Sequence, residues 1–152
     1  SKKSNIYLAQ PIDLNLRNQS GESAFSIAAS DGSIPVCIAI LEACAQDSNL
    51  EIVAPLDIQM TNQLHETPLM QASKAGHDQI IKAIFEACST HSTTRVTTPI
   101  DLNLQSTCGN TALHYACSNG HQGAVTLLCE ASSKHSKVKI RGPIDFNIRN
   151  ND

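Results

Sequence analysis

Large aromatic side chains are scarce in this chain of 152 residues: Trp is absent, and Phe and Tyr together make up 3%. The centre of a globular enzyme usually depends on such rings. Hydrophobic residues nevertheless account for 41% of the chain. The core must therefore be built from Ala, Leu, Ile and Val, which favours thin layers of helices with small side chains between them.

Long apolar runs, a strong net charge and paired cysteine motifs are missing as well. No run approaches the roughly 20 apolar residues that span a bilayer, and no basic-then-apolar leader stands at the start. A net charge of −3 gives no overall field that would attract nucleic acid or membranes. We therefore expect an intracellular protein, cytoplasmic or nuclear, with no nucleic-acid partner and no membrane insertion.

The six cysteines show no CxxC spacing and predict free thiols in a reducing compartment. Cys37 and Cys129 occupy apolar positions and are expected in the core, and Cys117 is expected to be a small packing residue. Cys44 and Cys88 stand 44 residues apart at matching helix ends, where packing is favoured over a disulfide. Cys108 is the thiol expected to be most exposed.

An internal repeat organises the whole chain. The tripeptide Pro-(Ile/Leu)-Asp recurs every 44 residues, and Ser, Asn/Gln and aliphatic positions repeat with the same period. Such a period predicts a solenoid whose units pack only on their neighbours. The predicted units are a tail of a preceding repeat at 1–12, repeats at 13–56, 57–100 and 101–144, and the start of a further repeat at 145–152.

Each unit predicts two helices and one extended segment. A Ser or Thr that can cap a helix is followed nine residues later by a Gly that can end it, which defines a first helix of two turns. A second, longer helix follows, with apolar residues at i, i+1, i+4 and i+5. Alternating apolar residues closed by Pro then predict a short extended segment. The cap and stop residues are Ser23 and Gly32, Thr67 and Gly76, and Thr111 and Gly120.

These units resemble the ankyrin repeat. TPLMQASKAGH (67–77) and TALHYACSNGH (111–121) are similar to the ankyrin motif T-P-L-H-x-A-x-x-x-G-H, with Met70 in place of the motif His. His65 stands where the family has the Gly of the hairpin turn. The resemblance implies an all-α repeat solenoid, an ankyrin-like stack of helix-turn-helix units with hairpin loops. It comprises about three repeats with partial units at both ends, and Leu113 is expected to be buried in it.

The unit is longer than the usual ankyrin repeat of about 33 residues. About 11 extra residues follow the second helix of each unit, at 44–54, 88–98 and 132–142. Three roles stay open for this insert: a ridge along the outer helices or short paired strands, a broader and stiffer core, or a docking face of its own.

No catalytic or metal-binding constellation is present. The chain lacks HExxH, GxxxxGK and GxSxG motifs. His77 and His121, like His91 and His135, stand at matching positions of successive repeats, so each such position supplies one ligand per repeat and does not converge on the four ligands of a zinc site. The basic run Lys134, Lys137, Lys139 and Arg141 has no interleaved aromatics and is interpreted as a solvated face. We expect no enzyme activity, no cofactor and no metal.

The resemblance implies a non-catalytic module that binds another protein through its hairpin tips and the concave face of its first helices. Tyr115 is the preferred anchor, since an amphipathic ring among polar neighbours often dominates an interface. The alternative is a targeting or regulatory segment of a larger multidomain enzyme or bacterial effector, the latter placing it in a host cytosol. The array is expected to be monomeric. The predicted contact residues are Arg17, Asn18, Gln19, Ile27, Ser30, Asp31, Asn62, Gln63, Leu64, Gln71, Lys74, Ser106, Thr107, Tyr115, Ser118 and Asn119.

Overall fold

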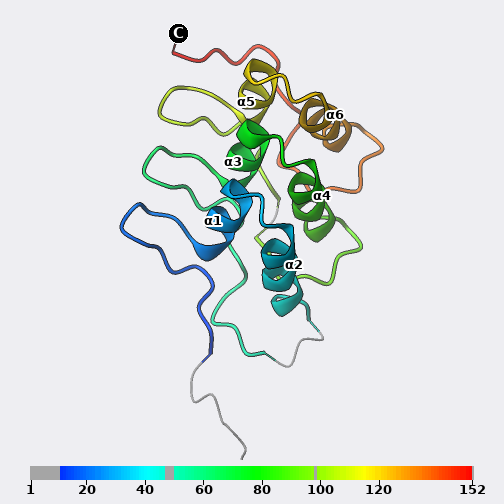
Figure 1. Cartoon of the computed structure of the whole chain (residues 1–152). Helices are drawn as coiled ribbons and strands as arrows, with labels where there is room; N and C mark the ends of the chain where they lie inside the picture. Colours follow the sequence, from blue (N-terminus) through cyan, green and yellow to red (C-terminus); the bar gives the residue numbers. More distant parts are fainter. Residues whose placement is uncertain (1–10, 47–49, 98, 152) are drawn as a thin grey trace, which may run out of the picture.

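Two parallel rows of helices make up the molecule (Figure 1). The computed structural model describes residues 11–46, 50–97 and 99–151, and within these ranges it contains six helices and no extended strand longer than an isolated bridge. The predicted tail at 1–12 lies outside the described residues except for its last two. The helices are α1 (Ala24–Ser30), α2 (Ile34–Ala43), α3 (Pro68–Ala75), α4 (Asp78–Ala87), α5 (Ala112–Ser118) and α6 (Gln122–Ala131).

The first helix of each pair begins at the predicted capping residue. The hydroxyls of Ser23, Thr67 and Thr111 each accept a hydrogen bond from the backbone amide three residues later. These bonds satisfy amides that have no partner within the first turn. Gly76 ends α3 in the left-handed conformation, with φ 75°. The local sequence therefore fixes both ends of the short first helices, as predicted.

The helices stack in the order of the repeats. In the first row α3 packs between α1 and α5, and in the second row α4 packs between α2 and α6 (Figure 1). Ala28, Ala72 and Ala116 are buried where the first helices meet, so their small side chains let the helices approach closely. This arrangement confirms the predicted all-α repeat solenoid.

The Gly-His pairs after α3 and α5 each join their repeat to the preceding one. The ring of His77 lies against Gly32, and a Cβ added to that glycine would come within 2.6 Å of the ring. His77 Nε2 also lies 3.2 Å from the backbone oxygen of Ser30. His121 repeats this contact on Gly76 and the oxygen of Lys74. These histidines are therefore structural links between repeats.

The inserts pair across the repeat junctions as short bridges. Val96 forms a parallel bridge with Leu56, and Thr94 forms an antiparallel bridge with Ala45. Four backbone hydrogen bonds accompany these bridges, including Leu56 N to Arg95 O at 2.9 Å and Arg95 N to Cys44 O at 2.8 Å. The next junction repeats the pattern between residues 88–100 and 137–141. Of the roles left open by the sequence, the described parts of the inserts adopt that of short paired strands.

The third repeat differs from the sequence-based expectation at three positions. Leu113 is only partly buried, whereas its equivalent Leu69 is buried. Cys129 and Cys117 are exposed rather than packed. The reason is the same in each case: among the described residues, no helix packs on the far side of α5 and α6, while α3 and α4 are covered on both sides. Cys37, Cys44 and Cys88 are buried free thiols and Cys108 is exposed, as expected.

Candidate partner-binding face

Three hairpins project side by side from the first helices (Figure 1). We call their tips, together with the exposed sides of α1, α3 and α5, the hairpin face. Each hairpin starts at the Asp of the Pro-(Ile/Leu)-Asp repeat, whose carboxylate accepts from the amide two residues later; Asp57 does so from Gln59 at 3.0 Å. This local bond holds the turn, which explains why the chain has Asp at that position in every unit.

The hairpin tips are tied to one another by hydrogen bonds that cross the repeats. Gln63 Nε2 donates to the oxygen of Gln19 at 2.7 Å, and Arg17 donates to the oxygen of Thr61 at 3.1 Å. The amide of Thr107 donates to the oxygen of Leu64 at 2.9 Å. Several residues predicted to contact a partner are therefore already engaged in holding the face together. The backbone of the tips is ordered before any partner arrives.

His65 occupies the left-handed turn position of the second hairpin, with φ 55°. Gly21 and Gly109 fill the same place in the other two hairpins, with φ 77° and 76°. A side chain with a Cβ is disfavoured in this conformation. His65 therefore keeps the turn geometry of the other hairpins, and it places a residue with a strained backbone conformation beside the hairpin tip.

The predicted contact residues separate into an exposed set and a buried set. Tyr115, Gln71 and Ser106 are 8%, 6% and 6% exposed, which corrects the expectation that Tyr115 is an exposed anchor. Asn62 is partly exposed. The twelve exposed ones are Arg17, Asn18, Gln19, Ile27, Ser30, Asp31, Gln63, Leu64, Lys74, Thr107, Ser118 and Asn119.

A polar cluster explains the burial of Tyr115. Its hydroxyl donates to Glu66 Oε1 at 2.8 Å and lies 3.0 Å from Ser106 Oγ. Lys74 Nζ lies 3.1 Å from the same carboxylate oxygen and 5.0 Å from the centre of the Tyr115 ring. Glu66 itself is 5% exposed. The cluster thus links α3, α5 and two hairpins through one buried carboxylate.

The cluster shifts the pKa values of its members. Burial favours the neutral form of Glu66, but the hydrogen bonds from Tyr115 and Lys74 and the charge of Lys74 together outweigh it, so its pKa lies below the usual value. The hydrogen bond to Glu66 raises the pKa of Lys74. Burial, followed by the effect of Glu66, raises the pKa of Tyr115. Glu66 and Lys74 therefore form an ion pair, with the Lys74 side chain 49% exposed.

Sequence reasoning missed Glu66, although it organises this part of the face. Its neighbours in the sequence mark only a helix start, and its partner Tyr115 lies 49 residues away. Gln71, next to the cluster on α3, has a buried side-chain oxygen without a hydrogen-bond partner. Among the described residues, no group of three or more His, Cys, Asp or Glu side chains is arranged to hold a metal ion.

The family assignment follows from this geometry and from a match that covers most of the sequence. The chain matches the family described as ankyrin repeats (3 copies) over residues 4–94 and again over residues 40–141. The chain is an ankyrin-repeat protein. No curated protein matches it significantly. Ankyrin repeats generally serve as protein–protein interaction modules, and the matched residues include the three hairpins and the six helices described above.

None of the helices in the described ranges is long and apolar enough to cross a membrane.

Proposed function

We propose that this ankyrin array is a non-catalytic binding module whose protein partner rests on the hairpin face. The observation that carries the proposal is the exposure of aliphatic side chains on a backbone already held in place. Leu64, 53% exposed, stands at the tip of the second hairpin, and Ile27 is exposed on α1. Lys74, exposed on α3, forms an ion pair with Glu66 on the same face. A partner that covers them loses little conformational entropy in the array.

The buried cluster supports the face from beneath. Because Tyr115 and Ser106 are buried, they contribute by positioning Glu66 and Lys74 rather than by touching the partner. The contact set that we propose is therefore the exposed one. An intracellular site of action, in the cytoplasm or the nucleus, belongs to the same proposal and is supported by six cysteines that are all free.

Quantitative capture from a lysate of the source organism tests the proposal. The substitutions Ile27→Ser and Leu64→Ser together remove the exposed aliphatic side chains of the face without touching the core. The matched control is Val53→Ser, which removes an exposed aliphatic side chain from the insert. We expect a protein that the parent array and the control retain to be lost by the double variant. Equal retention by all three arrays would place the binding surface elsewhere.

A further inference from the structure

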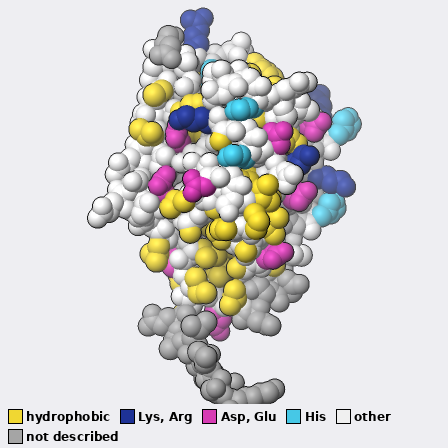
Figure 2. All heavy atoms as spheres, in the orientation of Figure 1, with side chains coloured by type: hydrophobic (Ala, Val, Ile, Leu, Met, Phe, Trp, Pro, Cys, Tyr) yellow, Lys and Arg dark blue, Asp and Glu magenta, His cyan; other side chains and the backbone are white. Residues whose placement is uncertain are grey.

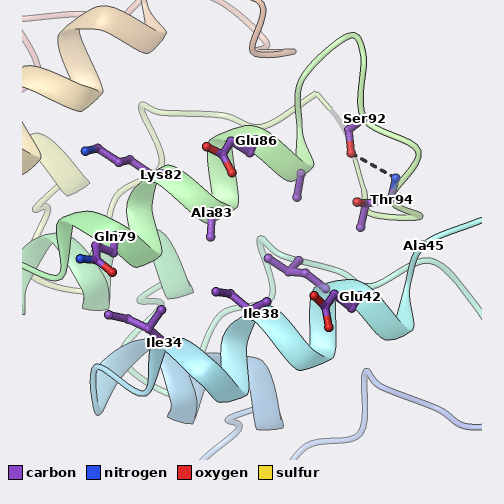
Figure 3. Close-up of a pocket in the computed structure, with 12 residues that line it drawn as sticks. Ile34, Ile38, Glu42, Ala45, Gln79, Lys82, Ala83, Glu86, Ser92 and Thr94 are labelled. Atoms are coloured by element: carbon purple, nitrogen blue, oxygen red, sulfur yellow. Dashed lines mark hydrogen bonds between the residues drawn. The ribbon is translucent and has the colours of Figure 1, made fainter. Parts of the chain in front are cut away.

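A groove on the opposite side of the array lies between α2 and α4, with a volume of about 520 Å³ (Figure 3). Ile38 and Leu41 from α2 and Ala83 from α4 give it an apolar floor. The insert closes one end: Ser92 Oγ accepts from the amide of Thr94 at 3.1 Å, and both residues line the groove. The hairpin face does not reach this region, so we name it the outer groove.

Apolar surface is exposed around the outer groove. Ile38, which lines the groove, is 41% exposed. Figure 2 shows hydrophobic side chains gathered in one area, with acidic side chains around it. Contiguous exposed apolar surface on a monomer commonly marks an interaction site.

Two carboxylates stand at the end of the outer groove near the insert. Glu42 and Glu86 occupy the same position in successive repeats, and both line the groove, one from each helix (Figure 3). Both are exposed, and in the described part of the chain the one ion pair is Lys74–Glu66, so neither is paired. Lys82, the one basic residue that lines the groove, extends from α4 towards the end away from the insert (Figure 3). This end of the groove therefore lacks a counter-charge.

The outer helices as a group are acidic. Together α2, α4 and α6 carry four acidic residues and one basic residue. An acidic segment would be repelled here, and a purely apolar one would leave two carboxylates facing it without a partner. A ligand that fits must combine apolar groups with a cation. Lys and Arg side chains suit such a site because their methylenes can cover apolar surface while the head group reaches a carboxylate.

The spacing along α2 specifies how that cation and the apolar groups are arranged. Ile34, Ile38 and Glu42 follow one another at four-residue steps along one side of the groove. Four residues of helix advance about 6 Å. Two residues of an extended chain advance about 6.6 Å. Alternate side chains of an extended segment therefore match these three residues in turn.

We propose that the outer groove binds an extended segment of a partner protein in which two aliphatic residues and an Arg or Lys alternate, in the pattern aliphatic-x-aliphatic-x-basic. The aliphatic side chains lie over Ile34 and Ile38, and the cationic head group lies between Glu42 and Glu86. The residues between them point away from the array. The insert, which forms the wall beyond the carboxylates, limits the segment at its basic end.

Fluorescence anisotropy with a labelled peptide, Gly-Leu-Ser-Leu-Ser-Arg-Gly, tests the proposal. We expect binding that weakens with salt, and a loss of about tenfold or more in affinity for the double variant Glu42→Gln/Glu86→Gln. Glu130→Gln is the matched control, because Glu130 occupies the equivalent position of the third repeat and does not line this groove. All variants are surface changes whose fold is checked by circular dichroism.

Exchanging the charges of the peptide and the array distinguishes specific binding from nonspecific binding. A peptide with Glu in place of Arg should not bind the parent array, and it should bind the variant Glu42→Arg/Glu86→Arg. The proposal is overturned if the parent array does not bind the Arg peptide at about 1 mM, an affinity near the weakest useful limit. It is also overturned if both peptides bind equally, or if Glu130→Gln costs as much as the double variant.

Discussion

Removing a single oxygen atom, by Tyr115→Phe, tests the cluster beneath the hairpin face. Phe retains the ring that packs between the repeats and that lies 5.0 Å from Lys74 Nζ. It removes only the hydroxyl that donates to Glu66 Oε1 at 2.8 Å. Because Glu66 is 5% exposed, water cannot replace that donor freely. The remaining donors are Lys74 at 3.1 Å and Asn62 at 3.5 Å.

The expected cost follows from the charge of the acceptor. A hydrogen bond to a charged group contributes about 1.5–3 kcal/mol to stability. Lys74 still neutralises Glu66 in the variant, so we expect the free energy of unfolding at pH 7 to fall by about 2 kcal/mol. For a chain of this length that corresponds to a melting temperature lower by about 4–8 °C. Urea unfolding followed by circular dichroism measures the first quantity directly.

The pH dependence of this stability penalty distinguishes a lost hydrogen bond to Glu66 from a general packing defect. The pKa of Glu66 is lowered in the folded array, so the stability that its ionised form contributes is present above its unfolded pKa of about 4.3 and is lost as the pH falls through its folded pKa. Tyr115→Phe removes one cause of the lowering. The penalty of the substitution should therefore shrink as the pH falls from 7 to about 3, below the unfolded pKa.

A double-mutant cycle with Glu66→Gln isolates the pairwise interaction. In the Glu66→Gln background the carboxylate is absent, and Tyr115→Phe should cost clearly less than in the parent array. The reasoning is refuted if Tyr115→Phe costs less than about 0.5 kcal/mol at pH 7, the level of an ordinary surface substitution. A penalty that is the same at pH 7 and pH 3 would equally show that the hydroxyl does not act through Glu66.

Three further predictions test the stack by urea unfolding. His65→Gly should stabilise the array by about 1 kcal/mol, since the left-handed turn costs a residue with a Cβ about 1–2 kcal/mol; a loss of stability would contradict this. Ile84→Ala, in the buried centre of α4, should cost about 2–5 kcal/mol and more than Leu113→Ala, which removes a partly buried side chain. Equal costs would show that the third repeat is as well covered as the second. Lys139→Pro removes the amide that donates to Cys88 O at 2.9 Å and should cost about 1–3 kcal/mol. The control is Lys137→Pro, because the amide of Lys137 has no hydrogen-bond partner among the described residues.

The sequence allowed the helices and their stacking to be predicted because the signals that fix them are local. A hydroxyl at Ser23, Thr67 or Thr111 reaches an amide three residues away, and its effect does not depend on the rest of the fold. Each signal also recurs at a fixed period, so the weaker copies, such as Ser23, are identified by their register with the stronger ones. The family resemblance rests on the same local residues.

The sequence left the pairing of the inserts as one of several alternatives, and the reason is physical. Alternating apolar residues such as Thr94 and Val96 indicate an extended segment, but they do not specify its partner. The partners lie about one repeat away, Ala45 at the start of the preceding insert and Leu56 just after its end. A backbone hydrogen bond carries no side-chain signature, so the sequence left the pairing undetermined.

On the hairpin face, the sequence likewise did not determine whether a single side chain, that of Tyr115, is buried. The equivalents of Tyr115 in the other repeats are Ile27, which is exposed, and Gln71, which is buried. Position in the repeat therefore does not determine burial here. What buries Tyr115 is Glu66, in the preceding repeat. The exposure of a residue on this face depends on the side chains of neighbouring repeats, and the resemblance to the family does not specify those.

The inserts give this array two sets of connections between repeats instead of one. The hairpins are joined by bonds such as Gln63 to Gln19, and the inserts by backbone bonds such as Arg95 to Cys44, on the other side of the helices. A junction held at both edges resists bending more than one held at a single edge. The same insert residues also form the end wall of the outer groove. We therefore expect the insert to stiffen the support of the hairpin face, and the outer groove that it borders is the second binding surface that we propose.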